Sequence, residues 1–252
     1  MNKKTNYYLG IDKNRKPITE GKHIGVGSFG RVFAFGNKAI KILGEPGFIA
    51  PTMSLKKCEA LIELDNEEHF LLPTDLVSED SFKFRGYAND YDEEGIPLDK
   101  YEDLVRTLSG CSIVENITAI TEQSIRFTSL HIAMDDTRLR NIILVRDKLK
   151  IVDFDGYVIR FAFGIDKVII TNGDFRRNNE KEVRQLLREI FYLYTKPTLR
   201  EFKDDMTTEA LARHDALMQK YENSHDKLKF VERELLPFEN GKEYCRNVLI
   251  KK

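Results

Sequence analysis

The chain has 252 residues, with 40 Lys and Arg against 41 Asp and Glu, so its formal net charge is -1. Hydrophobic residues make up 41% of it, enough to bury a core, which excludes an intrinsically disordered chain. The near-neutral charge argues against a dedicated nucleic-acid-binding protein, because such proteins usually show a basic excess. No run approaches the roughly 18 apolar residues that cross a bilayer, so we expect no membrane span.

The start of the chain and its cysteines indicate a compartment. The first residues are polar and basic without an apolar stretch, so a secretory signal peptide is not expected. The three cysteines are odd in number and far apart, which fits neither a metal site nor a disulfide framework. They are Cys58, Cys111 and Cys245. We therefore expect a reducing, cytoplasmic compartment.

The first third of the chain is predicted to be rich in strands around one helix. Residues 1–21 are polar and predict a loosely packed lead-in. Two segments rich in β-branched and aromatic residues flank Gly36 and Asn37, a turn signal, so they predict a β-hairpin. Residues 53–64 have apolar positions at helical spacing, with Ser54 as N-cap. Further strands are expected at 70–77 and 81–88.

The remainder of the chain is predicted to be mostly helical. Residues 89–95 are acidic and turn-rich, which is typical of a linker. Helices are expected at 99–108, 112–130, 180–194 and 207–236, and two strands at 142–145 and 150–152. The fold class predicted is therefore α+β, with a β-rich N-terminal lobe over 22–88 and a helical C-terminal lobe over 96–252.

The glycine-rich segment 25–30 reads G-x-G-x-x-G, a weak signal by itself. A simple glycine-rich turn is one interpretation. A dinucleotide-binding motif would need a helix directly after the glycines, and strands are predicted there instead. A P-loop would need Gly-Lys-Ser/Thr, which is missing. What remains is a glycine-rich hairpin whose backbone N–H groups can approach the phosphates of a nucleotide.

Lys41 follows one hairpin after these glycines. It lies between Ile40 and Ile42, so we expect its side chain on the opposite face of the strand from theirs. A solvent-facing lysine on an edge strand is the common alternative. Its position just downstream of the glycines favours a role in binding phosphate.

A second group of polar residues lies about 100 residues later in the chain. Asp136 and Asn141 are separated by four residues, and a predicted strand hairpin then leads to Asp153-Phe154-Asp155-Gly156. Amide and carboxylate oxygens are ligands that Mg²⁺ prefers. Asp136 is free to accept a proton or orient a hydroxyl group. Each piece alone has a structural explanation, as a turn, a cap or a hairpin end.

Taken in order, these motifs resemble the protein kinase-like superfamily, over about residues 22–195. The resemblance implies a two-lobed kinase fold that uses ATP with Mg²⁺, or alternatively Mn²⁺. It implies that Asp136, Lys41 and Arg138 are catalytic, and that Asn141, Asp153 and Asp155 hold the metal. It also implies that Glu59, or alternatively Glu63, pairs with Lys41. The nucleotide-binding residues implied are Gly25, Val26, Gly27, Ser28, Phe29, Gly30, Val32, Ala39, Lys41, Glu59, Tyr87 and Ala88, with the adenine against 84–88.

The chain departs from the family pattern at several positions. Met134-Asp135 replaces the His-Arg before the catalytic aspartate, so we expect no control through phosphorylation of an activation loop. Arg138 stands where the family has lysine, and Asp155 stands where it has the glycine of D-F-G. The stretch 156–179 is short and has no A-P-E, which leaves open whether a peptide-docking platform exists. The helix at 180–194 would be the central helix of the large lobe.

The leading functional prediction is a Ser/Thr protein kinase that transfers the γ-phosphate of ATP to a protein hydroxyl. One alternative is a small-molecule kinase of the aminoglycoside or choline type, and another is a nucleotide-binding pseudokinase scaffold. Transfer of AMP and glutamylation also occur on kinase-like folds. The small size and divergent motifs look like kinases that bacteria deliver into host cells or that viruses encode, which implies a protein substrate and a host-protein partner. The helices after residue 200 predict a solvated packing layer.

Overall fold

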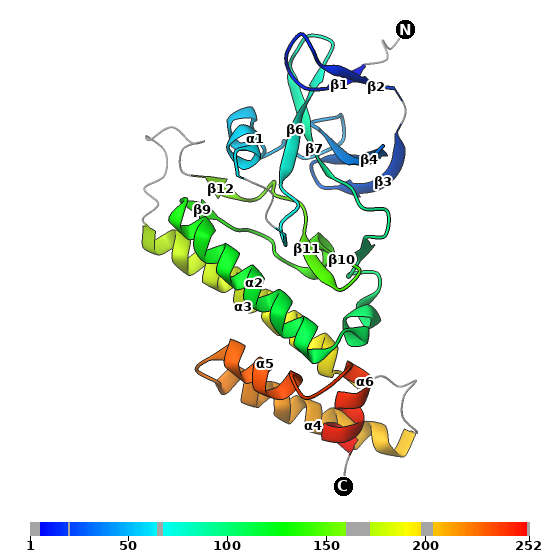
Figure 1. The fold of residues 1–252 in the computed structure, drawn as a ribbon, viewed down its shortest axis with the longest axis vertical. Helices are drawn as coiled ribbons and strands as arrows, with labels where there is room; N and C mark the ends of the chain where they lie inside the picture. Colours follow the sequence, from blue (N-terminus) through cyan, green and yellow to red (C-terminus); the bar gives the residue numbers. More distant parts are fainter. Residues whose placement is uncertain (1–5, 20, 65–67, 160–171, 198–203, 251–252) are drawn as a thin grey trace.

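The computed structural model describes residues 6–19, 21–64, 68–159, 172–197 and 204–250. The fold is α+β, as predicted: an antiparallel sheet with one helix forms the N-terminal part, and helices form most of the C-terminal part (Figure 1). The prediction for the short segment 156–179 falls largely on residues 160–171, which lie outside the described residues.

Seven strands form the N-terminal sheet, in the order β2-β1-β6-β7-β5-β4-β3. The predicted hairpin is confirmed, because β4 and β5 pair antiparallel with Phe35 opposite Lys38. Gly36 lies in the turn with φ of +57°, a conformation that glycine adopts without strain. The strands are β1 (Tyr7–Leu9), β2 (Lys16–Ile18), β3 (Lys22–Gly27), β4 (Gly30–Phe35), β5 (Lys38–Leu43), β6 (Pro73–Glu79) and β7 (Phe84–Asp90).

The prediction of a loosely packed lead-in over 1–21 was wrong for residues 6–19, the part of it that the structure chiefly describes. Residues in this segment form β1 and β2, and β1 pairs antiparallel with β6. Tyr7, Leu9 and Ile18 pack against a small apolar cluster that includes Ile40 and Ile42. The physical reason is the curl of the sheet, which leaves the β5 isoleucines needing a cover that β1 and β2 supply.

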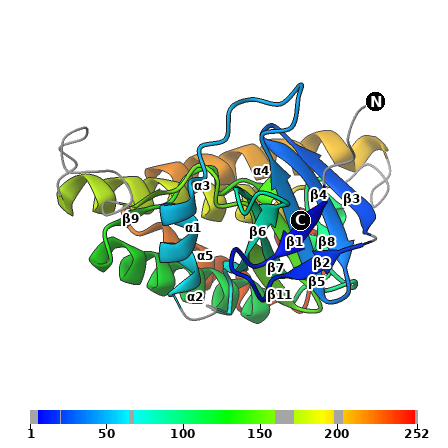
Figure 2. The same cartoon turned by 90° about the horizontal axis from the view of Figure 1, so that it is seen from above.

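Helix α1 (Leu55–Ile62) begins where the sequence predicts it. The Ser54 side chain accepts a hydrogen bond from the backbone N of Lys57, at 3.2 Å. This cap fixes where the helix begins, and Lys57, Cys58 and Leu61 are its buried residues. Figure 2 shows α1 beside the strands of the N-terminal sheet.

The C-terminal part is built on two long helices that pack side by side, α2 (Gly110–Ser129) and α3 (Asn172–Thr195) (Figure 1). The predicted strand pair is confirmed as the β10–β11 hairpin, extended by β8. The other elements are β8 (Ile96–Pro97), β9 (Ile132–Ala133), β10 (Ile142–Val145), β11 (Lys148–Ile151), β12 (Val158–Ile159), α4 (Asp204–Asn223), α5 (Lys227–Leu235), α6 (Gly241–Tyr244) and a final π-helical turn, Cys245–Ile250.

Three helix predictions needed correction. The region predicted as helical at 207–236 is divided between α4 and α5, which are separated at residues 224–226. The segment predicted as a helix at 99–108 is a 3-10 helix over Glu102–Thr107. Helix α3 begins at Asn172, well before the predicted residue 180. Its polar first turns lack the apolar periodicity that guided the prediction, and ion pairs one turn apart connect them instead, such as Arg177 with Asp174 at 2.7 Å.

One continuous apolar core joins the two parts of the molecule. Phe154 is fully buried, and its ring centroid lies 5.0 Å from that of Tyr157 and 6.5 Å from that of Phe70. Phe70 in turn packs edge-on against Phe127 of α2 at 4.8 Å. Because Phe154 sits between two aspartates, this packing fixes the segment 153–155 against both parts.

The three cysteines are free thiols. Among the described residues, no helix has the combined length and apolarity that crossing a bilayer demands.

The Gly30→Ala variant should lose about 3 kcal/mol of unfolding free energy, because its Cβ would overpack the sheet. That atom would lie less than 3.0 Å from both the carbonyl carbon and the oxygen of Ile42. The matched control is Gly25→Ala, whose Cβ would meet only Val32, at 3.9 Å. Urea unfolding should show no loss for this control, and equal losses for the two variants would contradict the prediction.

Candidate functional site

The site centres on an ion pair between two residues far apart in the sequence. Lys41 Nζ lies 2.8 Å from Asp153 Oδ1, although the two residues are 112 positions apart. Lys41 comes from the centre of β5, and Asp153 follows the end of β11. The lysine side chain is 6% exposed and the aspartate 31%, so the carboxylate is the accessible member of the pair.

The glycine-rich segment forms a tight hairpin over this ion pair. Gly27 of β3 pairs with Gly30 of β4, which leaves Ser28 and Phe29 as the turn. A Cβ on Gly27 would lie 3.8 Å from Lys41 Nζ and 4.0 Å from Asp153 Oδ2. The backbone at Gly27 therefore faces the two charged groups with no side chain between them.

The turn of this hairpin is attached to the loop that follows β5. The backbone N of Ile49 donates to the carbonyl of Ser28 at 3.1 Å, and the N of Gly44 donates to that of Phe29 at 3.3 Å. Val26, also predicted to bind the nucleotide, has its side chain 66% exposed. The hairpin is thus held at its turn while its outer face stays open.

Lys41 lies in register with two other predicted residues. Val32 is directly opposite it on β4, and Tyr87 is directly opposite it on β7. Directly opposed residues share one face of a sheet, so Val32 and Tyr87 flank the lysine. Ala39, two residues before Lys41, points to the same face and is opposite Asn89.

Asp155, predicted as a metal ligand, has another role in the structure. Its Oδ2 lies 2.6 Å from Lys41 Nζ, and its Oδ1 accepts a hydrogen bond from the Tyr87 hydroxyl at 3.0 Å. Its side chain is only 2% exposed. Burial raises the pKa of Asp155, with the charge of Lys41 acting in the opposite direction. The protein encloses this carboxylate and pairs it with Lys41, which argues against the predicted role of Asp155 as a metal ligand.

The predicted pairing of Glu59 with Lys41 was also wrong. Glu59 and the alternative Glu63 are exposed. The acidic partners of Lys41 are Asp153 and Asp155 instead. The packing of α1 against the rest of the protein turns Lys57 inward and leaves Glu59 on the outer face.

The charge of Lys41 is maintained by its two carboxylate neighbours. Burial acts to lower the pKa of Lys41, but the attraction of Asp155 and Asp153 outweighs it, and the pKa is raised. Lys57, 1% exposed, shows the opposite balance. Burial lowers its pKa to about 8 in spite of the neighbouring aspartates.

Tyr87 and Ala88, which were predicted to lie against the adenine, make other contacts in the structure. Tyr87 is 2% exposed and Ala88 is fully buried within the central strand β7. The Ala88 carbonyl accepts a hydrogen bond from the Thr74 hydroxyl at 3.2 Å. Tyr87 thus supports the carboxylate beside Lys41, and Ala88 belongs to the sheet core.

Asp136 lies in a loop among basic and amide groups. Its Oδ2 accepts from Arg140 at 2.6 Å and from the side-chain amide of Asn141 at 3.0 Å. Arg138 Nε lies 3.5 Å from Oδ1, and its side chain is 62% exposed. The same Asn141 amide also donates to the Asp136 backbone carbonyl at 2.9 Å. These contacts orient the carboxylate while leaving it 32% exposed.

Two of the site aspartates have strained backbones. Five described non-glycine residues have positive φ, and three of them, Phe82, His131 and Arg146, lie at hairpin turns or directly after a helix. The other two are Asp136, at +55°, and Asp153, at +69°. Such conformations are uncommon in non-glycine residues and cluster at functional sites, where the surrounding structure holds them.

The loop that carries Asp136 is anchored by residues that sequence reasoning missed. Asn179 of α3 accepts a hydrogen bond from Met134 N at 2.6 Å and donates to the Ile132 carbonyl at 2.9 Å. Glu182, one turn later, accepts from both the N and the Oγ1 of Thr137. Asn179 and Glu182 are three residues apart, so they lie about one turn apart on the same face of the helix. This spacing of two polar residues is the signal in the sequence that could have indicated their role.

The oxygen ligands expected for a magnesium ion lie at one end of the β10–β11 hairpin. Val152 N donates to the Asn141 carbonyl at 2.8 Å, which brings Asn141 next to Asp153 in space. Within the described ranges no cluster of three His, Cys, Asp or Glu residues could bind a metal. Nucleotide-bound Mg²⁺ needs only one or two protein carboxylates, so this pair of residues fits its chemistry.

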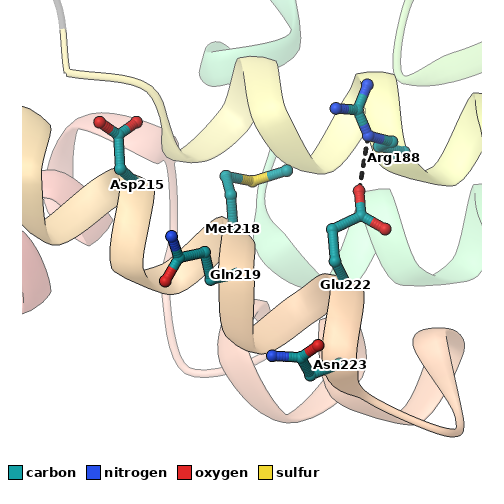
Figure 3. Close-up of a pocket in the computed structure, with 6 residues that line it drawn as sticks. All are labelled: Arg188, Asp215, Met218, Gln219, Glu222 and Asn223. Carbon is teal, nitrogen blue, oxygen red and sulfur yellow. Dashed lines mark hydrogen bonds and ion pairs between the residues drawn. The ribbon is translucent and has the colours of Figure 1, made fainter.

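A separate surface hollow of about 430 Å³ lies between α3 and α4 (Figure 3). Arg188 of α3 pairs across it with Glu222 of α4 at 2.7 Å. The other lining residues are Asp215, Met218, Gln219 and Asn223. It is wide open and contains none of the residues described above.

The sequence matches no protein-family model and no curated protein. A function is therefore inferred from the arrangement of the residues in the structure.

The Asn179→Ala variant should lose about 3 kcal/mol of unfolding free energy, because several buried polar groups would lose their partner at once. These include Met134 N and Ile132 O. Chemical denaturation would measure the loss. The matched control is Asn223→Ala on the exposed end of α4, expected within about 0.5 kcal/mol of the unaltered protein; a comparable loss in both would refute the anchoring role.

Proposed function

We propose that this protein is an ATP- and magnesium-dependent phosphotransferase with a protein kinase-like arrangement of its two parts. The observation that carries the proposal is the meeting of Lys41, Asp153 and the Gly27 backbone at one point. An ammonium group, a partly exposed carboxylate and a glycine hairpin are complementary to a nucleotide triphosphate with its metal ion.

Each residue has a role that follows from its position. Lys41, held by two carboxylates, binds phosphate oxygens beneath the glycine hairpin. Asn141 and Asp153 are the residues that would hold Mg²⁺, which neutralises charge on the phosphates when it is bound. Asp136 orients the acceptor hydroxyl and accepts its proton, and Arg138, on the open side of Asp136, contacts the transferring group.

The leading acceptor is a protein hydroxyl. The glycine hairpin with Phe29 in its turn and the Ala39-Ile40-Lys41 strand favour a protein kinase. The Asp-Phe-Asp segment and the short stretch 156–179 favour the second candidate, a small-molecule kinase of the aminoglycoside or choline type.

The Asp136→Asn variant should lower phosphoryl transfer by roughly 10²–10⁴-fold, because the amide cannot accept the proton of the acceptor. Asparagine is chosen because it tolerates the positive φ at this position. The assay follows labelled ATP, and affinity for Mg-ADP should stay within about twofold by calorimetry. Near-normal turnover would overturn the role of Asp136.

The Lys41→Met and Asp153→Asn variants should reduce transfer at least about 100-fold, since each removes a charge that the phosphates or their metal need. Asp153→Asn should also remove most of the magnesium dependence of nucleotide affinity, whereas Lys41→Met should keep it. Calorimetry with and without Mg²⁺ measures the difference, and circular dichroism checks the fold. Unchanged magnesium dependence in Asp153→Asn would exclude Asp153 as the metal ligand.

Acceptor class can be tested with labelled ATP and two sets of substrates, a protein mixture and a panel of aminoglycosides and amino alcohols. Label on protein is expected, and label on a small molecule would support the second candidate. Mass spectrometry of the purified chain after incubation with Mg-ATP separates addition of phosphate from addition of AMP. AMP addition, or no turnover with any acceptor, would count against the proposal.

A further inference from the structure

Asp155 connects four separate segments of the protein. Its carboxylate contacts Lys41 of β5 at 2.6 Å and the Tyr87 hydroxyl of β7 at 3.0 Å. Its backbone carbonyl accepts from Lys57 Nζ of α1 at 2.5 Å and from the Thr52 hydroxyl just before α1. One buried residue thus joins two strands, the loop before α1 and α1 itself.

The contact between Lys57 and Asp155 is buried on all sides. Lys57 is 1% exposed and Asp155 is 1% exposed. A buried ammonium needs both hydrogen-bond acceptors and a nearby negative charge. The Asp155 carbonyl supplies an acceptor, and the carboxylates of Asp155, Asp135 and Asp153 supply the charge. Helix α1 therefore contributes the ammonium group of Lys57 to the site, whereas the resemblance to kinases had implied the carboxylate of Glu59 or Glu63.

No carboxylate of α1 takes part in these contacts. Glu59 is exposed, and both acidic partners of Lys41 come from the segment after β11. Asp155 thus attaches α1 to the site, and the same residue pairs with Lys41.

We propose that Asp155 is a positioning residue that holds Lys41 for the nucleotide phosphates, and that Lys57 and Thr52 attach α1 to the site through it. The inference deepens the proposed function and rests on it. The position of α1 and the orientation of Lys41 then depend together on the segment 153–155.

Three variants of the full chain test the proposal: Asp155→Asn, Lys57→Met and Glu59→Gln. Asp155→Asn keeps the shape of the side chain and removes its charge, so affinity for Mg-ADP should fall tenfold or more. Lys57→Met keeps the apolar stem and removes the donor. Hydrogen exchange of peptides over Leu55–Ile62 should then become at least fivefold faster, with affinity for Mg-ADP changed less than threefold.

Glu59→Gln is the matched control on the exposed side of the same helix. Both its affinity for Mg-ADP and its α1 exchange should stay within twofold of the unaltered protein. A tenfold loss of affinity in Glu59→Gln would overturn the proposal, and so would unchanged α1 exchange in Lys57→Met. These two results test the proposal even if the Asp155→Asn variant does not fold.

Failure of the attachment of α1 and failure of the proposed function give different results. The exchange comparison needs no nucleotide, so it judges the attachment of α1 even if the unaltered protein fails to bind Mg-ADP, a result that overturns the proposed function. Binding by the unaltered protein together with full affinity in Asp155→Asn overturns the positioning role alone.

Discussion

The structure depends on the pairing of buried charges where its two parts meet. Lys41 and Lys57 are almost completely enclosed, and so is the carboxylate of Asp155. An uncompensated buried charge costs several kcal/mol, so these groups must stay together once the apolar core has closed around them. The requirement fixes β5, α1 and the segment after β11 relative to one another, and the core aromatic Phe154 fixes that segment from its other side.

The strained aspartates depend on the same surroundings. Asp153 adopts a positive φ between the buried Phe154 and the end of β11, and its carboxylate is held by Lys41. Asp136 adopts a positive φ in a loop that Asn179 and Glu182 anchor to α3. Strain of this kind persists only where the neighbouring contacts outweigh it. In both places the contacts come from segments distant in the sequence, so the local geometry is a product of the whole fold.

The proposed chemistry asks for positioning and charge more than for covalent work. Lys41 is the clearest case, since two carboxylates keep it charged and oriented without a ligand. Asp153 remains partly exposed, whereas Asp155 is enclosed. Two aspartates separated by one residue thus take different roles, because the chain turns one toward the open side and the other into the interior.

Much of the architecture could be predicted from the sequence by itself. The turn at Gly36, the N-cap at Ser54 and the apolar strands after Asn141 are local signals, and each produced the expected element. The resemblance to kinases implied that Lys41 and Asp153 belong to one site, and the structure brings the two into contact. Local patterns succeed here because turn geometry, capping and periodicity act over a few residues.

Only the tertiary structure decided which charged side chains face the site. The sequence offered Glu59, Glu63 and Lys57 on one short helix, and periodicity could not determine which would be enclosed. The packing of α1 turned Lys57 inward, and the buried carboxylate beside Lys41 came from Asp155 instead. The same is true of β1 and β2, whose apolar side chains mattered only once the sheet had curled and left Ile40 and Ile42 to be covered. Burial and pairing of charge depend on contacts between distant segments, which is why these features could not be predicted from local pattern.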